Sequence, residues 1–409
     1  MRRSLWLGAV ELAATVCFAA LLSSCNDAPS IVGSELVPGT DMIYTASTDS
    51  LPLIGGDSTA HTELPLLNSA YFLLGSTPTA DARAFFEVLN YPASIAGDSS
   101  YSDSTFEVTS ANLQIYPQHY GVGDTLDKTL ALNVYELKKF WPANVTWDSI
   151  WSGTGSTEYY STADRPIATY SGTMPSIVPD STVINIPFDQ ATVKRWIVAS
   201  RDTAARKLVY GFALVPSGMK HIRQFRNITS GVQSMRLRVI TRKRNDTIPF
   251  IYNLDMTVAG FVNDLDPTPT SLTIQGSRNV KASFTVSLDS LPAGAIIMGA
   301  DLRLTVDAKS SLIGSLGQDD KIGLDYQPPT GQRISIDSKS DSSGVYRFAN
   351  IGPLIDIVRR HRQPARFTIR TTGSSEFWTM NRTVFHGSTA ATALRPRLTL
   401  IYTVPTGSK

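Results

Sequence analysis

Residues 300–306, Ala-Asp-Leu-Arg-Leu-Thr-Val, alternate apolar and polar side chains. Successive side chains of a β-strand point to opposite faces of a sheet, so this stretch places its aliphatic residues on one face and its polar residues on the other. The same alternation occurs in residues 111–116, 235–240 and 397–402. It is typical of antiparallel strands with one face in the core and one face in water. The sequence therefore predicts an all-β fold.

Two short segments carry a helical pattern instead. Residues 189–200 and 351–362 place apolar side chains near positions i, i+3 and i+4, and each predicts a helix of about three turns. The strand and helix patterns recur in the same order in both halves of the chain. We therefore predict two tandem domains, 41–245 and 246–405, each an antiparallel β-sandwich with one short helix. The basic segment 242–246 is the expected hinge between them.

The composition excludes several classes of protein. Of the 409 residues, 37 are Lys or Arg and 35 are Asp or Glu, so the net charge of +2 gives no reason to expect nucleic acid as a partner. Charged residues make up 18% of the chain, below the usual value of about a quarter, which fits β-rich globular material and argues against disorder. Two cysteines cannot form a disulfide framework or a four-cysteine zinc site.

The N-terminal segment predicts export. Arg2 and Arg3 precede an apolar run at residues 12–22. This run is too short to span a bilayer as a permanent helix, and it has the length of the core of a secretory signal. Residues 1–24 are therefore interpreted as a signal peptide, and Cys17 is removed with it.

The end of that segment, Leu22-Ser23-Ser24-Cys25, resembles the bacterial lipobox. The resemblance implies cleavage before Cys25 and a diacylglyceryl group on its thiol; the alternative is a small hydrophobic cysteine in an ordinary secretory signal. Two or three acyl chains give firm membrane attachment, since each buried methylene contributes about 0.8 kcal/mol. Residues 25–40 are then the acylated cysteine and a flexible tether. We expect an exported protein anchored in the bacterial outer membrane, with the membrane face left open.

Further motifs resemble the DNRLRE domain, a jelly-roll sandwich of bacterial surface and secreted proteins. They lie in both halves and comprise Phe85–Val88, Ser110–Leu113, Phe140–Trp147, Phe188 and Asp189 with Val193 and Trp196, Ser283–Val286, Leu291–Ile297, Ala300–Leu304 and Arg395–Tyr402. The second half lacks the Val-Thr-Trp segment and is interpreted as a trimmed copy. The resemblance implies two jelly-roll-like sandwiches and a role similar to that of carbohydrate-binding modules. The chain is also similar to uncharacterised lipoproteins of Bacteroidota.

No catalytic pattern is evident in the sequence. The histidines at positions 61, 119, 221, 361 and 386 are scattered singly, and nucleophile elbows and phosphate loops are absent. Asp319 and Asp320 with Asp325, and the segment 263–266, could bind calcium, but both lack the ligand spacing of a calcium loop and are interpreted as acidic turns. We predict a protein that is not an enzyme and has no cofactor or metal apart from the lipid on Cys25.

Aromatic residues are the candidate ligand-binding groups. Trp141 and Trp147 occupy family motif positions and are interpreted as core. Trp151, Tyr159 and Tyr160 flank a Gly/Ser/Thr-rich loop at 151–160 and predict an exposed lip that contacts glycan. In the second half the comparable residue is Trp378.

Asp followed by Ser or Thr occurs nine times in a context similar to the O-glycosylation motif of Bacteroidota envelope proteins. The candidate acceptors are Ser50, Ser58, Ser104, Thr125, Ser149, Ser181, Thr203, Thr247 and Ser290. The alternative is that Asp-Ser and Asp-Thr form turns in a β-protein. Together these features predict a lipid-anchored envelope module that binds polysaccharide. A structural or adhesion lipoprotein that contacts another envelope protein is the alternative.

Overall fold

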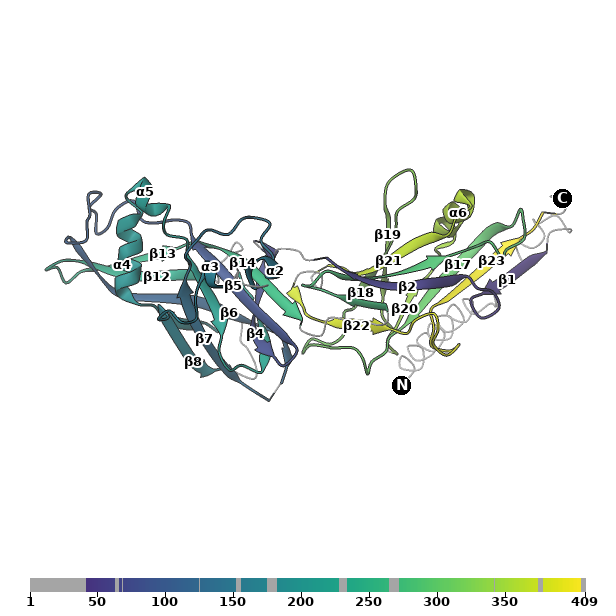
Figure 1. Ribbon diagram of the computed structural model, residues 1–409, viewed down its shortest axis with the longest axis horizontal. Coiled ribbons are helices and arrows are strands. Elements are labelled where there is room, and N and C mark those ends of the chain that lie inside the picture. The colour runs from purple at the N-terminus through teal and green to yellow at the C-terminus, as the bar shows by residue number, and fades with distance from the viewer. Residues whose placement is uncertain are drawn as a thin grey trace, which may run out of the picture.

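The computed structural model describes residues 42–62, 66–67, 69–124, 126–151, 156–174, 182–227, 234–264, 272–341, 343–373 and 378–405. Its strands form two antiparallel β-sandwiches that lie end to end (Figure 1). The predicted all-β, jelly-roll-like fold is therefore confirmed.

The first sandwich is built from one continuous, strongly curled sheet. Its strand order is β13-β12-β6-β11-β4-β5-β10-β7-β8, with β9 paired to β6, β14 paired to β5, and β3 paired to β14. The strands are β3 (Leu66–Leu67), β4 (Tyr71–Thr77), β5 (Ala80–Val88), β6 (Phe106–Gly123), β7 (Thr129–Glu136), β8 (Ala168–Thr173), β9 (Ile184–Pro187), β10 (Phe212–Pro216), β11 (His221–Arg226), β12 (Arg236–Lys243), β13 (Pro249–Leu254) and β14 (Met256–Asp264). The long strand β6 pairs with β12 along its first part and with β11 along its last part, so it carries the sheet from one layer to the other.

Helix α4 (Gln190–Ala199) packs one face, with Val193, Trp196 and Ile197, into the core of this sandwich. The side chain of Asp189 caps it by accepting the Thr192 backbone N–H at 2.8 Å. Trp196 is fully buried, stacks on Phe212, and donates its indole N–H to Glu136 Oε1 at 2.7 Å. The first sandwich also contains α2 (Trp147–Trp151), α3 (Ser156–Tyr159) and α5 (Thr203–Arg206). The prediction of one helix per sandwich is therefore wrong for this domain, because helices of four or five residues are too short to show a helical period in sequence.

The second sandwich has two separate sheets and the helix α6 (Gly352–His361). One sheet has the order β1-β23-β17-β20; the other has the order β19-β18-β21-β16-β15-β22, with β2 paired to β16. The strands are β1 (Ile43–Ser47), β2 (Ile54–His61), β15 (Leu272–Gln275), β16 (Val280–Val286), β17 (Ile296–Thr305), β18 (Lys321–Tyr326), β19 (Ile334–Lys339), β20 (Val345–Phe348), β21 (Ala365–Thr371), β22 (Arg382–Phe385) and β23 (Arg397–Thr403). Leu354, Ile355 and Val358 of α6 lie in the core between the sheets.

The strand pairing corrects the predicted domain boundaries. Strands β1 and β2 pair with β23 and β16, so residues 42–62 belong to the second sandwich. Strands β13 and β14 continue the first sandwich to residue 264. The expected hinge at 242–246 is the turn of the β12–β13 hairpin. The first sandwich is thus inserted between β2 and β15, an arrangement that pattern reading could not reveal because a strand's own residues do not specify its partner.

The two sandwiches meet at a packed junction. Tyr120 of β6 and Met380, which precedes β22, are both fully buried there. The Met380 backbone N–H donates to Tyr120 Oη at 2.7 Å, and Tyr120 Oη donates to Asn381 Oδ1 at 3.2 Å. Apolar side chains of the first sandwich, including Leu73, surround the contact. Side chains and backbone of both sandwiches are therefore joined in one buried cluster.

Candidate functional site

The aromatic residues at the loop 151–160 form a second core on the outer face of the first sheet. Tyr159 and Tyr160 are 6% and 2% exposed and pack around Phe85, and Trp151 is partly buried with its ring centroid 5.3 Å from that of Phe261. The expectation of exposed rings is wrong for Tyr159 and Tyr160. Phe85 and Phe261 project from the face of the sheet opposite the main core, and covering them removes large apolar area from water.

Polar contacts hold this cluster in place. Tyr160 Oη accepts hydrogen bonds from Arg83 Nη1 at 2.8 Å and from the Trp151 indole N–H at 3.2 Å. The Arg83 guanidinium also lies 5.2 and 5.1 Å from the ring centroids of Trp147 and Trp151. Trp141 is 4% exposed and Trp147 is partly buried, and both belong to this outer-face cluster and not to the core between the layers of the sandwich.

Trp378 lies at the junction rather than with the other candidate aromatics. Its ring meets Tyr71 edge-on at a centroid distance of 4.6 Å, and its indole N–H donates to Ser69 Oγ at 2.7 Å. Its backbone carbonyl accepts from Gln224 Nε2 at 2.9 Å. The structure therefore places Trp378 as a contact between the sandwiches.

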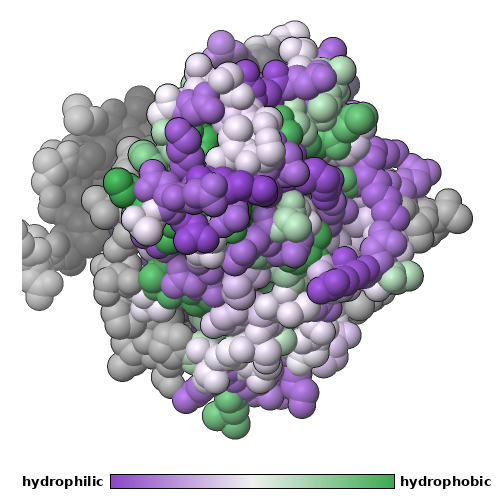
Figure 2. Space-filling model, turned by 90° about the vertical axis from the view of Figure 1, so that its left-hand side faces the viewer, coloured by the Kyte–Doolittle hydropathy of each residue, from purple (hydrophilic) through white to green (hydrophobic). Residues whose placement is uncertain are grey.

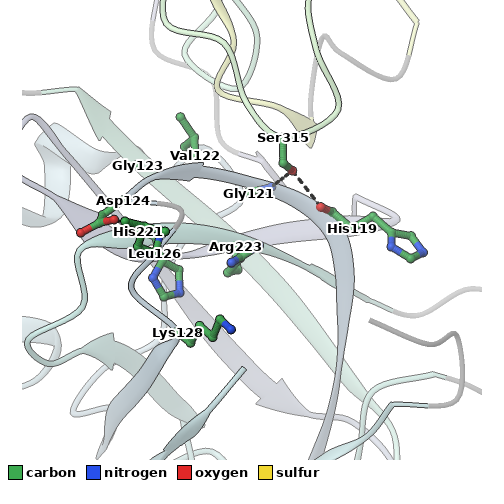
Figure 3. Close-up of a pocket in the computed structure, with 10 residues that line it drawn as sticks. All are labelled: His119, Gly121, Val122, Gly123, Asp124, Leu126, Lys128, His221, Arg223 and Ser315. Atoms are coloured by element: carbon green, nitrogen blue, oxygen red, sulfur yellow. Dashed lines mark hydrogen bonds between the residues drawn. The ribbon is translucent and has the colours of Figure 1, made fainter. Parts of the chain in front are cut away.

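A cleft of about 370 Å³ opens beside the junction (Figure 3). It is lined mainly by the end of β6, the following segment and β11 of the first sandwich, and Ser315 reaches it from the second. Figure 3 shows the side chains of His221, Arg223 and Lys128 near one another, while the imidazole of His119 points away from them.

His221 is the most buried titratable group of the cleft. It is 1% exposed, and its Nδ1 lies 3.6 Å from Asp127 Oδ2, which is too far for a hydrogen bond. Within the described residues neither ring nitrogen has a hydrogen-bond partner. Burial and the charge of Arg223 lower the pKa of His221. Hydrogen bonds from Thr129, the backbone N–H first, lower the pKa of Asp127 to about 2, so this carboxylate is charged throughout the physiological range.

Arg223 lies against the backbone of β6. A Cβ at Gly121 would come within 2.8 Å of Arg223 Cδ and Nη1, so the glycine makes room for the side chain. The Arg223 Nε atom is buried without a hydrogen-bond partner among the residues described, and burial lowers the pKa of the guanidinium. Leaving a buried donor unsatisfied costs about 1–3 kcal/mol. An acceptor oxygen in the cleft would recover that free energy.

Ser315 is a structural residue of the cleft. Its hydroxyl accepts the Gly121 backbone N–H at 2.9 Å and donates to the His119 carbonyl at 2.8 Å (Figure 3). Its backbone N–H donates to the Gly121 carbonyl at 2.8 Å. The hydroxyl hydrogen thus faces a carbonyl rather than a base, which does not suit a nucleophile.

In the sequence His221 is one of several singly placed histidines, and Arg223 and Lys128 belong to no motif. One signal was available. His221 and Arg223 are two residues apart in the segment His-Ile-Arg, so a strand places both side chains on one face. The approach of Lys128 from the segment before β7 could not be read from that spacing.

Aspartates of the first calcium candidate accept hydrogen bonds from neighbouring side chains of the protein. Asp325 accepts hydrogen bonds from Arg370 Nε at 2.9 Å and Ser335 Oγ at 2.6 Å. Asp319 accepts from Asn381 Nδ2 at 2.7 Å. The second candidate is described only in part, because Leu265 and Asp266 lie outside the described residues. In the described part of the chain, no three His, Cys, Asp or Glu side chains group as metal ligands, and no helix is long and apolar enough to cross a membrane.

The candidate glycosylation sites are accessible where the structure describes them. Exposed acceptors are Ser50, Ser58, Ser104, Ser149, Thr203, Thr247 and Ser290. Thr125, Ser181 and the lipidation candidate Cys25 lie outside the described residues. Local roles for the aspartates are also present. Asp202 caps α5 by accepting the Ala204 N–H at 2.7 Å, and Asp246 accepts the Ile248 N–H at 3.1 Å.

Comparisons with known proteins identify no family. No family model matches the chain, and no curated protein matches it. Among solved structures, that of the Gx strain of infectious bursal disease virus is 12% identical over 91% of this chain and 78% of its own, with a TM-score of 0.10. A mutant VP2 protein from derived particles of the same virus is 12% identical over 93% of this chain and 81% of its own, also with a TM-score of 0.10. Neither likeness bears on function.

Proposed function

We propose that this protein is a lipid-anchored, non-enzymatic binding module of the bacterial cell envelope, and that it binds an acidic polysaccharide in the junction cleft. The observation that carries the site is the pair His221 and Arg223, whose buried nitrogens face the cleft without hydrogen-bond partners among the described residues. Lys128 adds a third donor at the same place. Arg223 and Lys128 are cationic and match the oxygens of a carboxylate or sulfate on a sugar, while His221, whose pKa is lowered, adds an uncharged ring N–H; the carboxylates of Asp124 and Asp127 lie beside these donors.

The size of the cleft supports a short segment of a chain as its occupant. Its volume of about 370 Å³ lies near the lower end of the range of roughly 300–1,000 Å³ that is typical of small-ligand sites. Leu126, 87% exposed at the rim, offers an apolar surface to the C–H face of a sugar ring. The buried aromatic cluster is assigned a structural role in this proposal, so the cleft replaces it as the ligand site.

The location rests on the sequence. The short apolar run at 12–22 and the lipobox-like segment ending at Cys25 support export and acylation, and the resemblance to DNRLRE domains supports a role in carbohydrate binding. Under this proposal the anchor is in the outer membrane, and the exposed Asp-Ser and Asp-Thr segments are accessible to glycosylation.

Affinity electrophoresis of the mature acylated chain in detergent tests the ligand. Gels containing a uronate-rich polysaccharide are compared with gels containing neutral dextran. The wild type is expected to be retarded by the uronate gel. Arg223→Gln and Lys128→Gln should bind at least about tenfold more weakly, equal to about 1.4 kcal/mol. Since Lys128 is exposed, its replacement should leave the fold intact.

Arg242→Gln is the matched control. It removes one positive charge from the same sandwich, at the β12–β13 hairpin, where Arg242 pairs with Glu107 at 2.9 Å. Its retention should equal that of the wild type. If the control lost as much retention as the cleft variants, the effect would arise from net charge and not from the cleft. Unchanged retention of both cleft variants, or equal retardation by dextran, would refute the cleft as an acidic-sugar site.

One observation favours the alternative of a structural or adhesion lipoprotein. Strand β13 ends the strand order of the first sheet, and Ile251 on it is 54% exposed. An edge strand with an apolar side chain can accept a strand from another protein. In that case Ile251→Lys, and not Arg223→Gln, would abolish co-purification of an envelope protein from native membranes.

A further inference from the structure

Exposed apolar side chains cluster at one end of the second sandwich. Met42 is 68% exposed, Ile43 55%, Ile296 45%, Met298 53% and Ile401 44%. We call these five residues the apolar end patch. They come from three adjacent strands and the residue preceding β1, although they are far apart in sequence.

The register places most of the patch on the outer face of the four-stranded sheet. Ile43 and Ile296 both lie opposite Thr403, so the two isoleucines flank the same position of β23. A register shift between Ile297 and Gly299 inserts Met298 as an extra residue at this end. The inner face of the sheet is buried in the sandwich core, through side chains such as Tyr402. The apolar end patch is therefore additional to the core and has no cover among the described residues.

The patch lies where the tether reaches the folded body. Met42 is the first described residue, and 16 residues lie between it and Cys25, so the 17 Cα–Cα steps of an extended tether span at most about 55–60 Å. Figure 1 shows β1 and β23 at the end of the second sandwich that is remote from the first sandwich. An anchor at Cys25 would thus attach the molecule to the lipid through this end and not through the end that bears the cleft.

The opposite end of the molecule has a different surface. Figure 2 views the molecule from the first sandwich, and that face is mostly hydrophilic or neutral, with hydrophobic residues in separate spots. The two ends of the molecule therefore differ in surface. The apolar end patch lies at the end nearest the tether, and the end farthest from the tether is mostly hydrophilic or neutral.

Basic residues lie on the same outer face as the patch. Arg303 of β17 is opposite both Arg347 of β20 and Arg397 of β23, so the three form a row across the sheet. Arg347 pairs with Asp301 at 2.6 Å, and Arg397 pairs with Asp49 at 2.9 Å. Three arginines against two aspartates leave an excess positive charge. On this face the row lies toward the other end of the strands from the patch, with Arg397 four residues from Ile401 and Arg303 seven residues from Ile296. Apolar and basic side chains on one face are a combination that binds the interface of an anionic bilayer.

We propose that the apolar end patch contacts the lipid surface and seats the end of the second sandwich that is remote from the first against the membrane, so that the first sandwich and its cleft lie farthest from this contact. This inference rests on the lipid anchor of the proposed function and does not depend on the ligand. Tethering keeps the patch at high effective concentration beside the bilayer, so a modest apolar contact is enough to orient the protein.

A fluorescent label that senses its environment tests this orientation. Because the thiol of Cys25 carries the lipid, an introduced cysteine is the free thiol of the mature chain. Met298→Cys is labelled with a nitrobenzoxadiazole dye, and Ile251→Cys is the control, since these side chains are 53% and 54% exposed. Both acylated proteins are placed on vesicles of phosphatidylethanolamine and phosphatidylglycerol.

The dye at position 298 should gain at least about twofold in intensity when the protein moves from detergent-free buffer with no lipid to vesicles, and spin-labelled lipid should quench it. The dye at position 251 should do neither. Equal responses at the two positions would overturn the proposal. A dye at 298 that is shielded before lipid is added would also overturn it, because the tether or a second copy of the chain would then cover the patch.

Mass spectrometry of the same samples distinguishes a failure of the proposed orientation from a failure of the proposed lipid anchor. A silent dye at 298 on a chain whose Cys25 is acylated rejects the orientation alone. A Cys25 without lipid rejects the anchor, and with it the proposed envelope attachment.

Discussion

Replacing Tyr120 by phenylalanine removes one hydroxyl group from the junction between the sandwiches and leaves its ring in place. That hydroxyl accepts the Met380 backbone N–H at 2.7 Å and donates to Asn381 Oδ1 at 3.2 Å. Tyr120 and Met380 are both fully buried, so water cannot replace the lost partner without opening the junction.

The magnitude follows from which group loses its partner. The Met380 N–H becomes a buried donor without an acceptor, which costs about 1–3 kcal/mol. Asn381 loses little, because its Oδ1 keeps the Gly314 N–H at 2.9 Å. The apolar contacts of the ring are unchanged. We therefore expect Tyr120→Phe to lower the free energy of unfolding by about 2 kcal/mol, or about 30-fold in the equilibrium constant.

Urea unfolding, followed by tryptophan fluorescence and far-ultraviolet circular dichroism, measures this loss. Tyr101→Phe is the control, because the Tyr101 hydroxyl donates to the Pro92 carbonyl at 2.9 Å within the first sandwich and its loss leaves no buried N–H unpaired. A loss of less than about 0.5 kcal/mol for Tyr120→Phe, or a loss equal to that of the control, would refute the reasoning. The small loss would mean that the junction opens before either sandwich unfolds.

Three further outcomes are expected from the structure. Gly211→Ala should destabilise the protein by more than about 3 kcal/mol, because its Cβ would lie 1.7 Å from the Phe86 carbonyl oxygen at a φ of +95°. Gly218→Ala has a φ of +71° but open space around it, and should cost about 1–2 kcal/mol in the same urea measurement. Similar losses for the two variants would contradict this prediction. Tyr160→Ala should cost about 3–5 kcal/mol by calorimetry, and a loss below about 1 kcal/mol would show that its ring is not core. The pKa of Asp127 falls from 3.8 to about 2 on folding, so this carboxylate stabilises the protein above about pH 4 and loses that contribution as the pH falls toward 2. Asp127→Asn should therefore lose thermal stability less steeply than the wild type between about pH 4 and about pH 2. Parallel curves of melting temperature against pH would contradict this prediction.

Much of the strand and helix content was readable from local pattern. The alternating stretches at 111–116, 235–240, 300–306 and 397–402 lie in β6, β12, β17 and β23 or extend one residue beyond them. Their aliphatic side chains are buried, as the exposures of Leu113 at 0% and Leu302 at 2% show. The helical stretches correspond to α4 and α6. Period and burial agree here because each element buries one face in the core nearest to it.

The cleft was beyond prediction because its groups converge through pairing between distant strands. His221 and Arg223 lie on β11, Lys128 precedes β7, and Ser315 comes from the other sandwich. The prediction that the aromatic rings of the loop are exposed was wrong for a related reason. A Gly/Ser/Thr-rich context suggests solvent, but Phe85 on the outer face of the sheet needed cover, and Tyr159 and Tyr160 supply it.

The sequence by itself determined the class of fold, the positions of the two longer helices, and the prediction of an exported, acylated chain. These depend on period and on short contiguous motifs, which each segment carries within itself. Only the tertiary structure decided that residues 42–62 complete the second sandwich, that the first sandwich is inserted between β2 and β15, and that His221, Arg223 and Lys128 meet in a cleft beside the junction of the sandwiches. The physical reason is that a strand satisfies its backbone hydrogen bonds with whichever partner the whole chain brings beside it, and its own residues do not specify that partner.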